Sequence, residues 1–389
     1  MRSSYAVLRN LTKHGIDVVV ADSRRIGMCQ WSKYPSAKYT YTSHYENEEG
    51  FIEDILEICK KEQIDIVFPS HNETEILAKY SERFSASQKS LFPDYKTCEL
   101  FNNKALSYDH ASKSSVPVPF RYEYTSLNEL SMVLDNDRKS NKYVLKTLTG
   151  NSAKGVYYAE GKSSTIKLAE EVIAKYKLPQ SRFPQIEEYV EGDGWGCSCF
   201  YWHGTKITSF THRRLREKTS TGGTSTFRGA EVNELLEQYT KQILDSINWH
   251  GFAMVEFKVN PKSGQVWFIE VNPRLWGSFP MAVNAGVEFP HLALLCTEKG
   301  SDIALSQTKD MKIKNGFKSK WLLGELLLLT SSLCKLDFLN TYRILKDKCD
   351  SYDDFYLDDI QAFVGQILCY LISSLKNFSF NPEVKGMLK

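Results

Sequence analysis

The chain has 389 residues, 42% of them hydrophobic and 25% charged, which is typical of a soluble globular protein with about two or three domains. A formal net charge of +2 argues against nucleic acid as a main partner, because a protein that neutralises phosphates needs a marked basic excess. The nine cysteines show no CxxC spacing and the N-terminus has no long apolar run, so neither a zinc site nor a secretory signal is indicated. We expect a cytoplasmic protein.

Residues 1–95 alternate helical and strand patterns and predict a small α/β domain. The sequence favours a buried strand at 17–22, a helix at 51–62 and a second strand at 64–69. The strand and glycine-rich turn that normally open a doubly wound unit are missing, so this domain shows no nucleotide-binding pattern of its own. The 70–73 loop follows a strand at the edge where α/β sheets bind ligands, and it fits either a ligand loop or a solvated loop.

Residues 96–185 predict a second unit. A helix is expected at 102–114, and a strand at 143–147 leads into a loop at 148–156 that is rich in glycine and small residues. Small residues permit backbone N–H groups to approach phosphates closely. Lys146 lies on an otherwise apolar strand, where a lysine needs an anionic partner. Together the loop and the lysine indicate a phosphate-binding segment.

Two further segments each fit two interpretations. The strand predicted at 183–190 leads into acidic and glycine residues at 191–196, which suit either a purine and ribose site or a solvated turn. A basic run at 211–218 is followed by a glycine-containing stretch at 219–225. Such a run is either a solvated face or a clamp for a polyphosphate or carboxylate.

A hairpin is the most informative pattern of the chain. Two apolar runs, 252–259 and 266–271, flank turn-forming residues at 260–265, which predicts two antiparallel strands. Because successive side chains alternate between faces, Glu256 should lie opposite Glu270.

Facing carboxylates repel each other unless a cation lies between them or one is protonated. Alternation also places Phe268 and Asn272 on the face of Glu270, and the amide adds a neutral oxygen donor. Two carboxylates and an amide suit Mg²⁺, and Arg274 follows with a guanidinium able to grip a phosphate or carboxylate. The alternative is a surface hairpin with solvated glutamates, but the apolar neighbours of Glu256 and Glu270 favour the metal site.

The C-terminal part changes in composition. Residues 321–333 are strongly apolar, and 360–375 predict a helix that is shorter than the ~20 residues needed to cross a bilayer. This helix is expected to pack in the core, or else to dock on a membrane surface or partner. Exposed apolar surface on these helices would favour a homodimer.

The ordered combination of these features resembles the ATP-grasp superfamily, especially its members related to carbamoyl-phosphate synthase and D-alanine–D-alanine ligase. The residues that carry the resemblance are Lys104, Lys146, Glu187 to Val190, the arginine-rich run before Gly222 and Gly223, Glu256, Glu270, Asn272 and Arg274. The resemblance implies a mixed α/β and α+β fold: a Rossmann-like pre-ATP-grasp domain (1–95), a two-lobed ATP-grasp domain (96–185 and 186–305) and a helical C-terminal region (306–389).

The resemblance also implies ATP with Mg²⁺ or Mn²⁺, and a role for each matching residue. Nucleotide binding falls to Lys104, Lys146, Ser152, Gly155, Glu187, Glu188, Val190 and Asp193. Metal binding falls to Glu256, Glu270 and Asn272, and catalysis at the transferring phosphate to Arg274, Arg214 and Arg216. Substrate binding falls to Arg213, Gly222 and Gly223.

The activity implied is an ATP-dependent ligase that joins a small carboxylate to an amine, or to a thiol, through an acyl phosphate, and releases ADP and phosphate. A carboxylase or carbamoyl-phosphate-type enzyme and a non-catalytic ATP-binding scaffold are the alternatives. The acid and the amine are not identified by the sequence.

Overall fold

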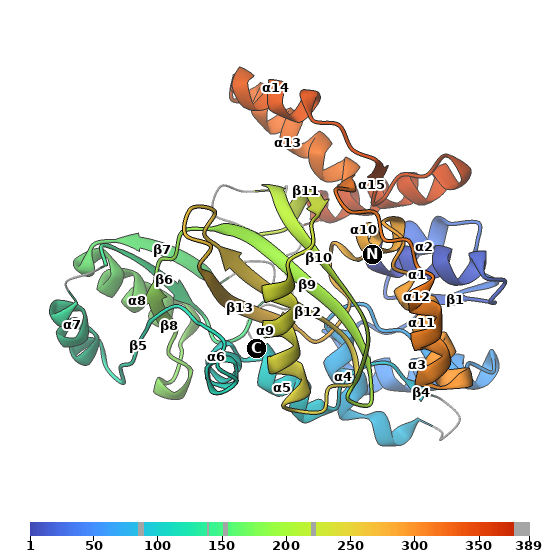
Figure 1. The fold of residues 1–389 in the computed structure, drawn as a ribbon, viewed down its shortest axis with the longest axis horizontal. Coiled ribbons are helices and arrows are strands. Elements are labelled where there is room, and N and C mark those ends of the chain that lie inside the picture. The colour runs from blue at the N-terminus through green and yellow to red at the C-terminus, as the bar shows by residue number, and fades with distance from the viewer. Residues whose placement is uncertain (85–88, 138–139, 151–154, 219–222, 377–389) are drawn as a thin grey trace.

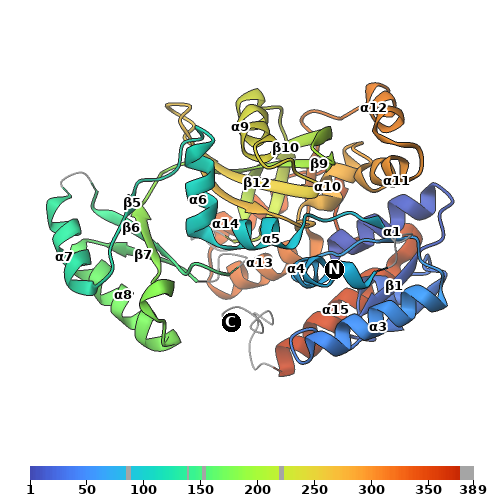
Figure 2. The ribbon, with the colours of Figure 1, turned by 90° about the horizontal axis from the view of Figure 1, so that it is seen from below.

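The computed structural model describes residues 1–84, 89–137, 140–150, 155–218 and 223–376. A small lobe with β5 to β8 stands to one side of a large curved sheet, and the N-terminal α/β unit lies on the other side (Figure 1). The C-terminal helices α13 to α15 lie above the sheet in this view, and the view from below confirms that α15 runs beside the N-terminal unit (Figure 2).

The N-terminal unit is built from short parallel strand pairs flanked by helices. Its elements are α1 (Arg2–Lys13), β1 (Val19–Asp22), α2 (Met28–Trp31), β2 (Ala37–Thr40), α3 (Glu48–Lys61), β3 (Ile66–Val67), α4 (Glu73–Lys79), β4 (Lys89–Ser90) and α5 (Tyr95–Asn102). The predicted strands and helix are present. β1 pairs with β2 and β3 with β4, both in parallel, so this unit has two separate pairs where a Rossmann-like domain has one continuous sheet.

The small lobe is a four-stranded antiparallel sheet, in the order β5-β8-β6-β7, with two helices on one face. Its elements are β5 (Arg121–Tyr122), α7 (Leu127–Asn136), β6 (Lys142–Lys146), β7 (Val156–Glu160), α8 (Lys162–Tyr176) and β8 (Gln185–Glu188). The preceding helix, α6 (Lys104–Lys113), packs against the large sheet, whose core includes its Tyr108 and Ala111. Leu130 and Leu134 of α7 pack with Ala169 and Val172 of α8 against the sheet. Since β8 belongs to this sheet, the lobe extends past the boundary expected at 185.

The large sheet has seven strands in the order β13-β12-β9-β10-β11-β14-β15. It is formed by β9 (Asp193–Trp202), β10 (Thr205–Glu217), β11 (Ser225–Ala230), β12 (Gly251–Val259), β13 (Val266–Asn272), β14 (Lys318–Lys320) and β15 (Ser351–Tyr352). The helices α9 (Glu234–Asp245), α10 (Phe279–Asn284), α11 (Phe289–Lys299) and α12 (Ser301–Lys309) complete this part. The predicted hairpin is therefore confirmed as β12 and β13. Cys197 and Cys199 are fully buried in the core beneath it, as expected of packing residues.

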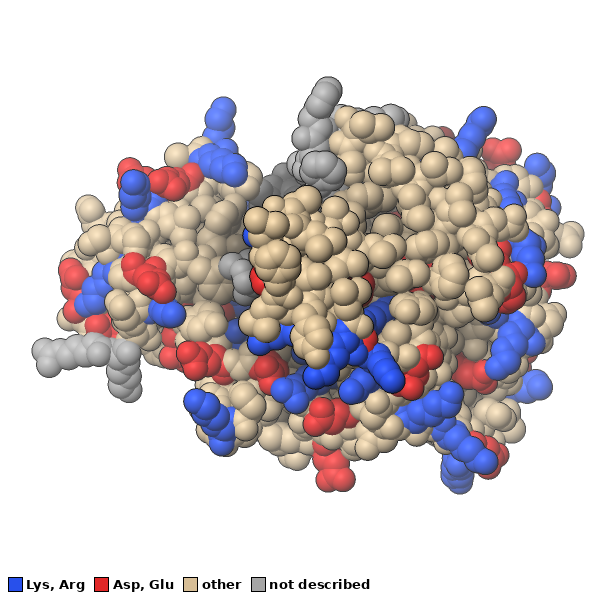
Figure 3. Space-filling model, turned by 90° about the horizontal axis from the view of Figure 1, so that it is seen from above, with Lys and Arg blue, Asp and Glu red and all other residues tan. Residues whose placement is uncertain are grey.

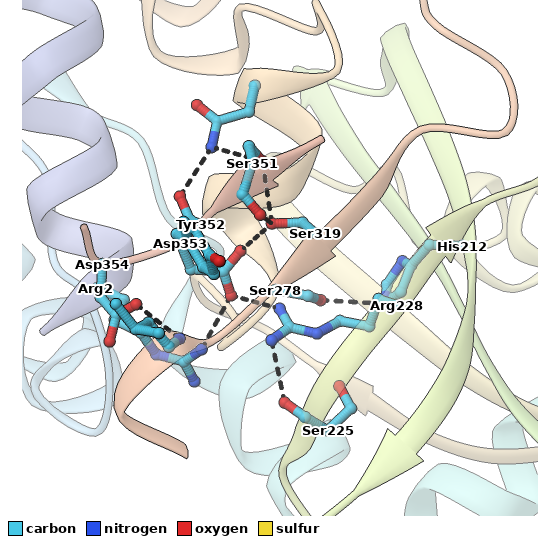
Figure 4. A network of polar contacts seen from close by, with 12 residues as sticks. Arg2, His212, Ser225, Arg228, Ser278, Ser319, Ser351, Tyr352, Asp353 and Asp354 are labelled. Atoms are coloured by element: carbon cyan, nitrogen blue, oxygen red, sulfur yellow. Dashed lines mark hydrogen bonds and ion pairs between the residues drawn. The ribbon is translucent and has the colours of Figure 1, made fainter. Parts of the chain in front are cut away.

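The C-terminal region is not only helical, because β14 and β15 extend the large sheet between α13 (Leu322–Cys334), α14 (Phe338–Lys346) and α15 (Ile360–Lys376). Figure 4 shows how it is anchored. The fully buried Asp353 forms ion pairs with Arg2 of α1 at 2.9 Å and with Arg228 of β11 at 2.7 Å, and it accepts a hydrogen bond from the Ser319 hydroxyl at 2.6 Å. Within the described part of the chain, no helix is long and apolar enough to cross a membrane.

Candidate active site

The acidic pair lies on the hairpin as its pattern predicts. Glu256 of β12 pairs with Glu270 of β13, and Met254 with Asn272. A bulge follows, because Phe257 pairs with Phe268 and leaves Ile269 as an extra residue. Phe268 consequently turns to the opposite face and is buried with Phe257, so the prediction that it shares the face of Glu270 is wrong. The bulge keeps apolar residues on the core side and both carboxylates on the other.

Three polar side chains surround the acidic pair. The Asn272 amide donates to Glu256 Oε1 at 3.2 Å and to Glu270 Oε1 at 3.4 Å. Arg214 Nη2 lies 2.5 Å from Glu256 Oε2, and Lys104 Nζ lies 4.0 Å from Glu270 Oε2. Burial raises the pKa of Glu256, while the charge of Arg214 acts to lower it. The site thus concentrates acidic and basic groups in a partly desolvated place, as sites that bind charged ligands do.

Two glycines of β9 make room for side chains of β10 on the face of the acidic pair. β9 lies between β10, which carries Arg214, and β12, which carries Glu256. A Cβ added at Gly194 would stand 2.9 Å from Arg214 Cδ, and one at Gly196 would stand 2.5 Å from His212 Cε1. A side chain at Gly194 would occupy the space of Arg214, and one at Gly196 would occupy the space of the His212 ring. The glycines of 191–196 therefore have a structural purpose that neither sequence interpretation had given them.

A second charged cluster lies on the small lobe. Lys146 Nζ is 2.5 Å from Glu187 Oε1 and donates to the Tyr108 hydroxyl at 2.8 Å, and Gln185 donates to the other oxygen of Glu187 at 2.9 Å. Both charged residues are almost fully buried, at 5% and 2% exposed. The anionic partner that Lys146 was predicted to need is thus supplied by β8.

Lys104 connects the two clusters. It is the first residue of α6, whose N-terminus is capped by the Asn103 side chain at 3.0 Å from Ala105 N. Its ammonium donates to the Gly150 carbonyl at 2.9 Å. Burial lowers the pKa of Lys104, and Glu270 is the strongest of the charges that act against this. The predicted phosphate-binding lysines and the acidic pair therefore lie around one place, between the two lobes.

The other residues predicted to bind the nucleotide contact protein groups outside the two charged clusters. The Glu188 side chain turns away from Glu187 and accepts from Phe120 N, just before β5, at 3.0 Å. The Val190 carbonyl accepts from Lys258 at 3.0 Å. Asp193 pairs with Arg213 at 2.7 Å, with both side chains more than a third exposed.

The predicted loop residues are placed only in part. Gly155 has φ +73°, and a Cβ there would stand 2.0 Å from Thr147 Oγ1, so only glycine fits against that strand end. The Gly223 carbonyl accepts from Arg214 at 3.3 Å. Ser152 and Gly222 lie outside the described residues.

Arg216 departs from its predicted position. A bulge separates it from Arg214, since Arg214 pairs with Arg228 of β11 but Arg216 pairs with Phe227. Arg216 therefore points to the opposite face, where it forms ion pairs with Glu325 and Asp347 of the C-terminal helices. The structure does not bring it to the acidic pair.

Arg274 faces the N-terminal unit. It lines a cavity of about 10 Å³, room for about one water molecule. The other residues of this cavity are His71, Asn72, Thr74, Glu75, Cys98, Asn102 and Pro273. Burial lowers the pKa of Arg274, and Glu270 and Glu256 act against this. The 70–73 loop thus lies beside a predicted catalytic residue.

His212 was not predicted as a site residue. It pairs in register with Gly196, which in turn pairs with Glu256, so it lies on the face of the acidic pair. It is buried, with Nε2 3.0 Å from the Ser278 hydroxyl (Figure 4). Burial lowers its pKa to about 3, with Arg228 and Arg214 adding to the effect. Its position two residues before Arg214 on a strand was the available signal.

The comparisons identify the fold. Residues 185–322 match the model of a family described as "ATP-grasp in the biosynthetic pathway with Ter operon". Over these residues the sequence is similar to the ATP-grasp superfamily. No curated protein sequence matches it.

Solved structures with a similar ATP-grasp fold are distant in sequence. The biotin carboxylase domain of Hydrogenobacter thermophilus 2-oxoglutarate carboxylase, determined with MgADP and bicarbonate, has a TM-score of 0.62 and 14% identity over 77% of this chain and 68% of that one. Biotin carboxylase of Campylobacter jejuni, in a β,γ-ATP complex, has a TM-score of 0.63 and 13% identity over 80% and 71%. An ADP complex of PurK, N5-carboxyaminoimidazole ribonucleotide synthetase, has a TM-score of 0.58 and 14% identity over 82% and 78%. At these identities the likeness establishes the ATP-grasp fold.

Proposed function

We propose that this ATP-grasp chain is an ATP- and Mg²⁺-dependent ligase that joins a small-molecule carboxylate to an amine, with an acyl phosphate as intermediate. The observation that carries the proposal is the acidic pair on β12 and β13, placed between two buried lysines and Arg214. The MgADP and ATP complexes of the similar structures support the choice of nucleotide and metal.

The residues present fit a magnesium ion. Two facing carboxylates and the Asn272 amide are hard oxygen donors, and Mg²⁺ commonly takes few protein ligands and completes its shell with water and substrate phosphates. Among the described residues, no three His, Cys, Asp or Glu side chains converge on one point, so the amide would be the third protein donor. When bound, the ion would neutralise charge on the transferring phosphoryl group.

The chain's own residues would hold and activate the reactants. Lys104 and Lys146 would bind the phosphates, Glu187 would position the lysine beside it, and Arg214 and Arg274 would stabilise the charge that develops as phosphate moves to the acid. A carboxylate is a poor electrophile, so its conversion to an acyl phosphate would let an amine attack and expel phosphate. Little covalent chemistry falls to the protein, whose contribution is position and charge.

A carboxylase is the second candidate. The observation in its favour is the bicarbonate bound in the Hydrogenobacter biotin carboxylase domain and the carboxylating reaction in the name of PurK. Here bicarbonate would be the acid that is phosphorylated.

The test is ADP release from Mg-ATP with a panel of acids and amines, and with bicarbonate. Turnover with an acid–amine pair supports the ligase, and turnover with bicarbonate supports the carboxylase. ATP binding without ADP release in any combination would refute both and leave a scaffold.

A matched pair of variants tests the site itself. Arg214→Met should reduce turnover at least about 100-fold, as removal of a group that stabilises transition-state charge does. Arg216→Met, the same change two residues along β10, should leave turnover per folded molecule within about twofold, because that side chain faces the C-terminal helices. Equal losses in the two variants would contradict the assignment.

A further inference from the structure

The helical hairpin formed by α13 and α14 has an apolar outer face. Fourteen of the 25 large apolar side chains exposed among the described residues lie between 326 and 375, so exposed apolar surface is concentrated at this end of the chain. Seven of them, each 44–70% exposed, are on the hairpin: Leu326, Leu333, Leu336, Phe338, Leu339, Tyr342 and Leu345. In α14 they follow the spacing of one helix face, while Ile344 points inward and is buried.

The exposed charges of the hairpin and the two residues that follow it, 322–348, are mainly positive. Its three acidic residues are engaged within the protein: Glu325 and Asp347 by Arg216, and Asp337 as the N-cap of α14. Its four basic residues are exposed, and in the part of the chain that the structure describes none forms an ion pair with an acidic side chain. They are Lys335, Arg343, Lys346 and Lys348. The outward surface therefore combines apolar side chains with an excess of positive charge.

The last helix also has exposed apolar side chains. α15 exposes Ile360, Val364, Leu371 and Leu375 along its length. Figure 3 looks down on the C-terminal helices, and uncharged residues spread over the middle of this view, with Lys and Arg along its lower border among some acidic residues. Scattered single apolar residues need no explanation, but a broad patch of this kind marks an interaction surface.

Charge decides between the two simplest occupants. In a two-fold dimer the same patch meets itself, so the four basic side chains would face four of their own kind. An anionic lipid bilayer suits both kinds of side chain. An amphipathic helix on its surface buries apolar side chains at the acyl boundary and pairs Lys and Arg with anionic headgroups. We propose that the α13–α14 hairpin docks this protein on the surface of an anionic phospholipid membrane.

The anchorage of the hairpin suits this purpose. Arg216 of β10 and Lys320 of β14 hold Glu325 at its base, the latter at 3.4 Å. By register, Arg216 and Lys320 lie on the face of the large sheet opposite to Arg214 and the acidic pair. A protein docked through the hairpin would therefore keep the candidate active site on the other side of the sheet from the membrane.

Vesicle co-sedimentation tests the proposal with the full chain. We expect binding to phosphatidylcholine vesicles that contain phosphatidylserine, no binding to phosphatidylcholine alone, and loss of binding at high salt. Each cation near an anionic surface contributes about fivefold to the affinity, so Arg343→Gln with Lys346→Gln should weaken binding roughly 30-fold. Phe338→Ser with Leu339→Ser should weaken it at least about 100-fold.

Matched controls use equally exposed residues elsewhere. Phe120→Ser with Met132→Ser removes two exposed apolar side chains from the small lobe, and Lys96→Gln with Lys113→Gln removes two exposed cations. These variants should bind vesicles as the parent does. The proposal fails if the parent ignores anionic vesicles or if control and hairpin variants weaken binding equally. It also fails if light scattering shows a dimer that only the Phe338 and Leu339 variant dissociates, because the face would then be a self-interface.

Discussion

Replacement of Lys146 by methionine separates the structural contribution of this residue from its nucleotide-binding contribution. In the native protein its ammonium lies 2.5 Å from Glu187 Oε1, and the two residues are 5% and 2% exposed. Methionine fills a similar volume but leaves a buried carboxylate without its cation. Breaking a buried pair from one side costs about 3–5 kcal/mol, so Lys146→Met should lower the free energy of unfolding by that amount.

The paired change Lys146→Met with Glu187→Gln should restore most of that loss. The glutamine amide oxygen can still accept from Gln185, whose contact is 2.9 Å, and no unpaired charge remains. The free energy of unfolding of the double variant should therefore lie within about 1 kcal/mol of that of the parent.

Nucleotide affinity should not recover with stability. A charge-assisted hydrogen bond from Lys146 to a phosphate contributes about 1.5–3 kcal/mol, so both variants should bind Mg-ATP about 10- to 100-fold more weakly. Urea unfolding measures the first quantity and titration calorimetry the second. If the double variant regains full ATP affinity, Lys146 has a structural function only, and the nucleotide site does not lie where we place it.

Two further predictions concern the face of the acidic pair. The pKa of His212 is lowered to about 3, so below its ordinary value of 6.5 the unfolded chain takes up a proton that the folded protein refuses. Between neutral pH and pH 5 the free energy of unfolding should therefore fall by about 2 kcal/mol, as measured by urea unfolding at both pH values. In a His212→Gln variant the fall should be smaller. An equal fall in the parent and the variant would contradict the lowered pKa of His212. Gly194→Ala places a methyl group 2.9 Å from Arg214 Cδ and should reduce turnover at least about tenfold, whereas Gly27→Ala, whose nearest neighbour is 3.9 Å away, should be neutral in the same ADP-release assay. Equal activity of the two glycine variants would show that the reach of the arginine across β9 is not needed.

Local patterns were enough to place the hairpin and its acidic pair. The turn residues at 260–265 and the period-two alternation on either side set which residues face each other, so the sequence alone pairs Glu256 with Glu270, as the structure does. Lys146 was identified in the same way, since a lysine within an apolar strand signals a missing partner. These inferences hold because each depends on contacts between residues close in sequence.

The sequence alone could not show the bulges. An extra residue at Ile269 turns Phe268 into the core, and another irregularity after Arg214 turns Arg216 to the other face of the sheet. Alternation predicts faces correctly only while the register is unbroken, and one inserted residue reverses every assignment beyond it.

The order of the strands in the large sheet also depends on tertiary packing. Arg214 meets Glu256 because β9 lies between their strands and carries Gly194 where the arginine crosses. The sequence of residues 1–278 thus determines the individual strands and helices of the site and the register within the hairpin. Which strands become neighbours is decided by the packing of the two cores on either face of the sheet, because only burial of those cores stabilises contacts so far apart along the chain.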